Sequence, residues 1–135
     1  MSSQSTVLSG WDAVQDFRKL KVWERSHDLA LAVYAATAAF PKEEQFGLTS
    51  QIRRSASSVP SNIAEGCGRD GNSEFRRFLF IALGSANELE YQLLLARDLG
   101  FIPLDDHERL AAATVEVKMM PSSLIAKVKG RGSEL

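Results

Sequence analysis

Five arginines form the most prominent group of side chains that could bind a ligand. They are Arg53, Arg54, Arg69, Arg76 and Arg77. Between residues 50 and 80, three acids, Glu65, Asp70 and Glu74, oppose them. A planar guanidinium group donates hydrogen bonds in a geometry that fits phosphate oxygens, so this group is a candidate nucleic-acid-binding surface. The alternative is that the arginines pair with acids of the same chain or of a neighbouring subunit. No aromatic platform for stacking bases accompanies them, so the sequence supports no base specificity.

A second polar group is expected where the segments around residues 62 and 88 meet. Its predicted members are Asn62, Glu65, Ser85 and Glu88. A pair of carboxylates, Glu65 and Glu88, could perform acid–base chemistry or hold a metal. The favoured interpretation is a structural hydrogen-bond network between two helices, with Arg53 or Arg54 as its counter-ion.

Motifs for metal binding or nucleophilic catalysis are incomplete. The di-iron pattern of helical bundles needs Glu-x-x-His on two helices. Glu24 and His27 have this spacing, but Leu104 stands three residues before His107. The single cysteine, Cys67, excludes an internal disulfide and a cysteine-based zinc site. The sequence therefore predicts no catalytic residue, no metal and no cofactor.

The composition is that of a soluble globular protein, with 135 residues, 44% apolar and 24% charged. A formal net charge of −1 gives no global electrostatic case for binding nucleic acid or an anionic membrane. The first residues lack the basic region and long apolar core of a signal peptide. No run reaches the roughly 18 apolar residues that suggest a membrane span. We therefore expect a cytoplasmic protein without a membrane partner.

Four amphipathic segments must position these side chains. Apolar residues recur at helical spacing over residues 22–39, 44–66, 73–99 and 104–129. Breakers rich in proline and glycine separate the segments, and their shortness predicts antiparallel neighbours. Pro60 is expected to kink the second helix, and Pro121 to kink or break the fourth.

The predicted fold is therefore an all-α, antiparallel, up-and-down four-helix bundle over residues 17–129. Residues 1–16 are polar and serine-rich, and we expect a flexible N-terminal arm. Residues 130–135 are expected to form a C-terminal tail.

The third predicted helix carries more apolar residues than one buried face requires. Five of them point largely away from its main stripe: Phe80, Ile81, Tyr91, Leu95 and Leu99. A four-helix monomer covers one face of each helix, so the second face predicts an oligomer interface. The alternative is a scatter of harmless exposed apolar residues.

The second and third predicted helices contain four distinctive motifs. They read FGL at 46–48, QIRR at 51–54, SVPSNIAEG at 58–66 and FxxFLxIAxGSxxELE at 75–90. Over about residues 17–129 the chain resembles the bacterial four-helix bundle family named for proteins encoded in intervening sequences of large-subunit ribosomal RNA genes. The resemblance implies a barrel-like homopentamer. It also implies kinship with the accessory variability determinant of diversity-generating retroelements, which looks like a basic pentamer that binds nucleic acid and the reverse transcriptase. This chain is nearly neutral instead.

These observations predict a non-enzymatic, oligomeric binding or scaffold protein. Its expected partners are further copies of itself and either nucleic acid or a nucleic-acid-processing protein, with the arginines repeated around a pentamer as the candidate surface. One alternative is a structural oligomer with a protein partner only. The other is an enzyme that uses the Glu65–Glu88 pair.

Overall fold

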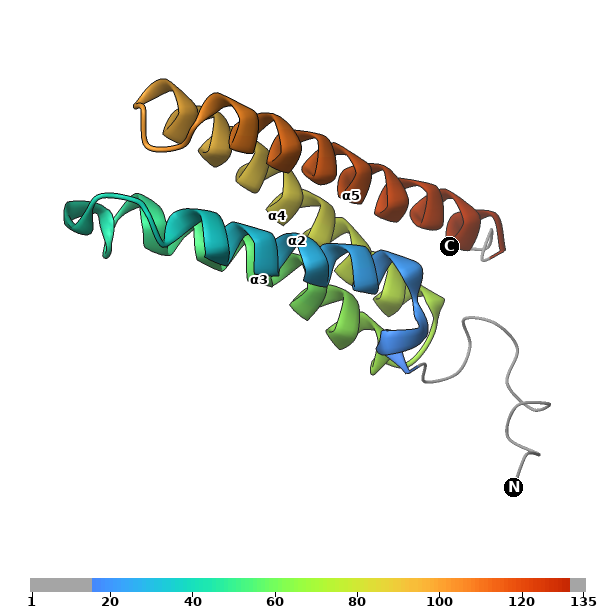
Figure 1. Cartoon of the computed structure of the whole chain (residues 1–135). Helices are drawn as coiled ribbons and strands as arrows, with labels where there is room; N and C mark the ends of the chain where they lie inside the picture. Colours follow the sequence, from blue (N-terminus) through green and yellow to red (C-terminus); the bar gives the residue numbers. More distant parts are fainter. Residues whose placement is uncertain (1–15, 132–135) are drawn as a thin grey trace.

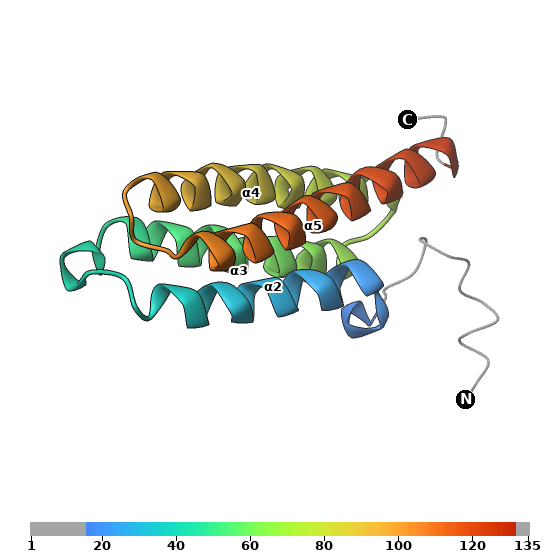
Figure 2. The same cartoon turned by 45° about the horizontal axis from the view of Figure 1, so that its top comes forward.

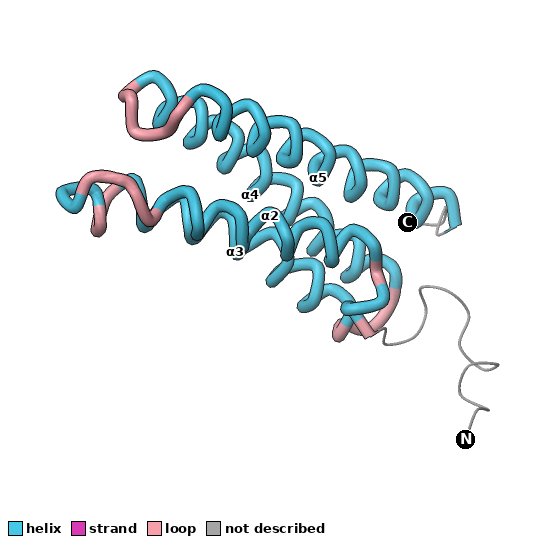
Figure 3. Tube along the Cα trace, in the orientation of Figure 1, coloured by secondary structure: helices cyan, strands magenta, loops and turns pink. Residues whose placement is uncertain are grey.

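The computed structural model describes residues 16–131, and in that range it contains helices and no strand (Figures 1 and 3). The four α-helices are α2 (Lys21–Thr37), α3 (Leu48–Cys67), α4 (Asn72–Asp98) and α5 (Leu104–Arg131). Two short 3-10 turns, η2 (Phe17–Lys19) and η3 (Lys42–Glu44), precede α2 and α3. The predicted all-α four-helix architecture is confirmed. Most of the predicted arm, residues 1–15, and residues 132–135 of the predicted tail lie outside the described residues.

The helices follow one another along the bundle in antiparallel order (Figures 1 and 2). The contact between α3 and α4 is the most extensive, followed by those of α4 with α5 and of α2 with α3. A smaller contact between α2 and α5 completes the bundle, so α2 and α4 occupy opposite corners. This arrangement leaves outward faces between α2 and α3 and on α4.

Helix α3 begins later than its apolar pattern predicts. Gly47 occupies its N-cap position with φ −113° and ψ −112°, which separates η3 from the helix. The Glu44 side chain then accepts a hydrogen bond from the backbone N–H of Leu48 at 3.1 Å. This satisfies one of the free donors of the first helical turn. The predicted start at residue 44 is wrong because Glu44 caps α3 and does not extend it.

Both internal prolines lie within continuous helices. Helix α3 passes through Pro60, and α5 passes through Pro121. Both proline side chains are buried. Of the two outcomes predicted at Pro121, a kink or a break, the break is wrong, since α5 continues ten residues further to Arg131.

One core of apolar side chains joins the four helices. Its largest fully buried members include Ile52, Ile63, Leu79, Leu89 and Leu93. Gly66 lies where α3 and α4 approach closely, because a Cβ atom at this position would lie 2.9 Å from Cβ of Phe78. The buried glycine therefore sets the spacing of the two helices that share the largest contact.

Candidate functional site

Arg53 fixes the C-terminal end of α2 to α3. Its Nε donates to Oγ1 of Thr37 at 2.7 Å, and its Nη2 donates to the carbonyl of Tyr34 at 3.1 Å. The guanidinium carbon also lies 4.7 Å from the centroid of the Tyr34 ring. A cation here bonds to a carbonyl of the last helical turn and complements the helix dipole. Arg53 is therefore occupied in holding the fold.

Arg69 and Arg77 flank the same aromatic ring near the turn between α3 and α4. Their guanidinium carbons lie 5.1 Å and 4.5 Å from the centroid of Phe78. Arg69 also forms a 2.8 Å ion pair with Glu65, and Arg77 forms one of 3.2 Å with Glu74. The hydrogen bond from Arg77 lowers the pKa of Glu74. Both arginines are therefore paired with acids three or four residues away in the chain.

The five arginines do not form one patch. Arg54 precedes Arg69 by fifteen residues, which corresponds to about 22 Å along a helix. Arg76 precedes Arg77 on α4, and its guanidinium carbon is 5.1 Å from the Phe80 ring centroid. The candidate arginines are therefore divided between two ends of the α3–α4 contact, and their binding of nucleic acid stays a prediction.

Two of these arginines keep unsatisfied groups. Arg54 is exposed, and its side chain has no hydrogen bond or ion pair within residues 16–131. Nε of Arg76 is buried, and no acceptor among the described residues reaches it.

A small polar network joins α3 to α4 through Ser58. Oγ of Ser58 lies 2.8 Å from Oγ of Ser85. The Asn62 amide donates to the Ser58 carbonyl at 2.8 Å and to its hydroxyl at 2.9 Å. Because the Ser58 hydroxyl oxygen accepts from Asn62, its proton is free to be donated to Ser85. Asn62 and Ser85 are thus connected through Ser58, which the sequence prediction missed and which stands one helical turn before Asn62.

Glu65 and Glu88 lie outside this network and apart from each other. Both are exposed, and Glu65 pairs with Arg69 in the turn that follows α3. The Ser58–Ser85 contact places Glu88 level with residue 55 of antiparallel α3, about 15 Å from the level of Glu65. The predicted roles of these acids in the network and in a carboxylate pair are both wrong.

Helix α4 exposes apolar side chains toward solvent, and we call Phe80, Ile81, Tyr91 and Leu94 the α4 face. Phe80 is 48% exposed and Tyr91 is 60% exposed. Leu99 is also exposed, at the end of the helix. Two details differ from the sequence prediction. Leu95 is half-buried and packs against the core, whereas Leu94 is exposed.

A groove of about 460 Å³ runs between α2 and α3. Bulky side chains form one wall, and small ones from α3 form the floor. The wall comprises Phe17, Trp23, His27, Leu31 and Tyr34, and the floor comprises Ser57, Pro60, Ser61 and Ala64. The Trp23 and His27 rings stack with centroids 4.8 Å apart, which rigidifies the wall. Sequence reasoning missed this α2–α3 groove, although the spacing of its small residues was visible.

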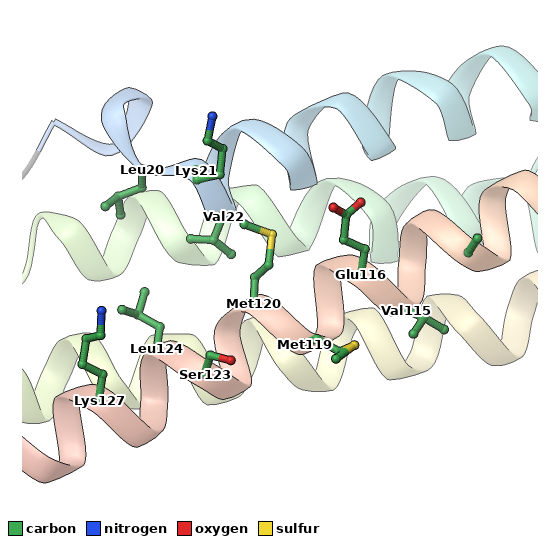
Figure 4. A pocket seen from close by; sticks show the side chains of 11 residues that line it. Leu20, Lys21, Val22, Val115, Glu116, Met119, Met120, Ser123, Leu124 and Lys127 are labelled. Carbon is green, nitrogen blue, oxygen red and sulfur yellow. The ribbon is translucent and has the colours of Figure 1, made fainter.

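A larger hollow of about 610 Å³ lies between the start of α2 and the middle of α5 (Figure 4). Val22, Val115, Met119, Met120 and Leu124 line it, and Lys21 and Lys127 stand at its rim. Glu116, also on its lining, forms an ion pair with Arg25. The lining is suited to apolar contacts and offers no nucleophile paired with a base.

The remaining chemical candidates are weak. Burial raises the pKa of the Cys67 thiol to about 11, so the reactive thiolate is disfavoured. Among the described residues, no group of three or more acidic, histidine or cysteine side chains could hold a metal ion. Within the same residues, no helix is long and apolar enough to cross a membrane.

Comparison with known proteins gives a family match and similar solved structures. The model of a family described as 23S rRNA-intervening sequence proteins matches residues 18–123. A solved structure of a protein with unknown function, from the S23 ribosomal protein family of Bacteroides thetaiotaomicron, aligns with a TM-score of 0.70 and 28% identity. The alignment covers 77% of this chain and 97% of that one. No curated protein matches.

Proposed function

The chain belongs to the 23S rRNA-intervening sequence protein family, and we propose that it acts as a non-enzymatic, homo-oligomeric scaffold of the cytoplasm. The observation that carries this proposal is the pair of apolar surfaces on a bundle that already has a complete core. One is the α4 face and the other is the α2–α3 groove.

The α4 face and the α2–α3 groove are different surfaces, and one end of the α4 face lies across the bundle from the groove. Tyr91 and Leu94 border α5, where they share a hollow with His107 and Ala111. The groove lies between α2 and α3, across the bundle from that border. Two different surfaces favour head-to-tail contacts, which close into a ring when the rotation between subunits allows it. Together with the family resemblance, this supports a pentamer.

The geometry also favours binding over catalysis. The two acids considered for catalysis stand about 15 Å apart along the bundle. The one thiol is held in its protonated form by burial. A scaffold role requires neither group.

Assembly can be tested on the α4 face. Phe80→Asp and Tyr91→Asp place charges on exposed positions, so they should leave the helical fold intact and dissociate the oligomer. Leu104→Asp is a matched control, because Leu104 is 71% exposed and belongs to neither apolar surface. Light scattering after gel filtration would measure the mass of each variant. Wild-type protein that is monomeric at every concentration would refute the proposal.

Nucleic acid is the second candidate partner. The observation favouring it is the buried Nε of Arg76, which has no acceptor among the described residues and which a ring would repeat. The test is the fluorescence anisotropy of a labelled RNA hairpin at low salt. Binding that weakens in Arg76→Ala and not in the control Arg97→Ala would support this candidate. No binding at low salt would leave a protein partner only.

A further inference from the structure

We infer that the α4 face of one subunit seats in the α2–α3 groove of the next, and that Glu88 of the first subunit pairs there with Arg54 of the second. This inference rests on the proposed oligomer and adds which surfaces meet, in which register, and which charges select the contact.

The groove has the shape of a helix-binding site. Its floor is nearly flat because it consists of small side chains, among them Ser57, Ser61 and Ala64. A flat floor allows another helix to approach closely. The stacked Trp23 and His27 form a fixed aromatic wall beside that floor. A helix that presents a row of bulky apolar side chains complements this combination of a flat floor and a rigid wall.

Helix α4 presents such a row. Phe80 and Ile81 are exposed one turn before Gly84. A Cβ atom at Gly84 would meet nothing within 4 Å, so this glycine serves no contact inside its own subunit. Its lack of a side chain instead lets a neighbouring backbone approach α4 between Ile81 and Glu88.

The register follows from a contact inside one subunit. Ser58 and Ser85 touch at 2.8 Å, so residues of antiparallel α3 and α4 at equal and opposite offsets from them share one height along the bundle. Ile81 is then level with Asn62, and Glu88 is level with residue 55. Rotation about an axis parallel to the helices preserves height. In such a ring, Phe80 and Ile81 face the groove floor while Glu88 faces Arg54.

The two charged side chains at this height, Arg54 and Glu88, have opposite signs and no partner among the described residues. Neither Arg54 nor Glu88 has a side-chain hydrogen bond or ion pair with any other described residue, and both are exposed. Their neighbours differ in this respect, since Arg53 bonds to α2, Glu65 pairs with Arg69, and Glu90 pairs with Lys118. An apolar contact flanked by one free cation and one free anion favours a single orientation and disfavours like-charged alternatives.

In the competing arrangement, Arg54 and Glu88 pair within one subunit. Mixing two variants of opposite charge distinguishes a pair within one subunit from a pair between subunits. Arg54→Glu and Glu88→Arg each place like charges at every subunit junction, and each should weaken assembly by about tenfold or more. A mixture of the two variants restores opposite charges wherever the subunits alternate. Sedimentation velocity of the mixture should therefore show oligomers that neither variant forms alone. In a ring of five, one junction stays mismatched, so recovery is incomplete.

The groove itself is tested by a bulky charge on its floor. Ser61→Arg should abolish assembly, whereas Ser123→Arg, at an exposed serine of α5 beside the other hollow, should not. If mixing restores nothing while the double variant Arg54→Glu/Glu88→Arg assembles, the pair lies within one subunit and the inference is overturned. Single variants that assemble like wild type would also overturn it. Both of these results leave the proposed oligomer standing, whereas monomeric wild-type protein removes the oligomer itself.

Discussion

Gly66→Ala tests whether the spacing of α3 and α4 depends on a missing side chain. The added Cβ would lie 2.9 Å from Cβ of Phe78 and 3.2 Å from Cδ1 of Phe75. The first distance is shorter than packed carbon atoms tolerate, and Cβ of Phe78 cannot rotate away because it is bonded to the backbone. The Phe75 and Phe78 side chains are both buried, so α4 itself must shift.

The magnitude follows from two opposing effects. Overpacking a well-filled core costs about 1–3 kcal/mol. Alanine is favoured over glycine inside a helix by about 1 kcal/mol. We therefore expect Gly66→Ala to lower the free energy of unfolding by up to about 2 kcal/mol.

Gly84→Ala is the matched control, since Gly84 also lies within a helix and has open space around it. It should raise the free energy of unfolding of the isolated chain by about 1 kcal/mol. Urea titrations followed by circular dichroism would measure both variants at a concentration where the chain is monomeric, because assembly adds to apparent stability. A Gly66→Ala variant that gains about 1 kcal/mol of stability, as the Gly84→Ala control should, would refute the packing argument.

Three further predictions concern single side chains. Arg53→Ala removes the hydrogen bonds that tie α2 to α3 and should lower the free energy of unfolding by about 1–2 kcal/mol. The control Arg54→Ala should change it by less than about 0.5 kcal/mol in monomeric protein. Equal effects of the two variants in urea titrations would contradict this prediction. Ser85→Ala leaves the Ser58 hydroxyl without an acceptor on α4 and should cost about 1 kcal/mol in the same assay, and no change would show that the bond contributes nothing. Cys67 should react slowly with iodoacetamide at pH 8 unless urea is present, because burial raises its pKa from 9.0 to about 11. Since the unfolded chain loses this proton first, stability should fall as pH rises from 9 toward 11, and a Cys67→Ala variant should lack this component.

The fold was largely predictable because apolar residues that recur at helical spacing over a long segment mark the buried face of a helix. The pattern places all four helices within a few residues of their observed bounds. It fails at the start of α3, where Glu44 and Gly47 make a turn and a cap by geometry that periodicity does not encode. It also overstates Pro121, since α5 stays continuous through it.

The candidate sites were less predictable because their members depend on side-chain partners. The Glu65–Arg69 pair has the four-residue spacing of a helical ion pair, so its local nature was available from the sequence. Arg53 shows the opposite case, because its partners on α2 follow from the way two helices cross. The α2–α3 groove likewise arises from the packing of two separate segments, and no single stretch of sequence contains it.

Sedimentation velocity of the full chain over a wide concentration range tests most directly whether this bundle works as an assembly of identical subunits. We expect one discrete species with five times the 14.8 kDa mass of the chain, which Phe80→Asp converts to monomer. A single species at the mass of one chain throughout that range would contradict it.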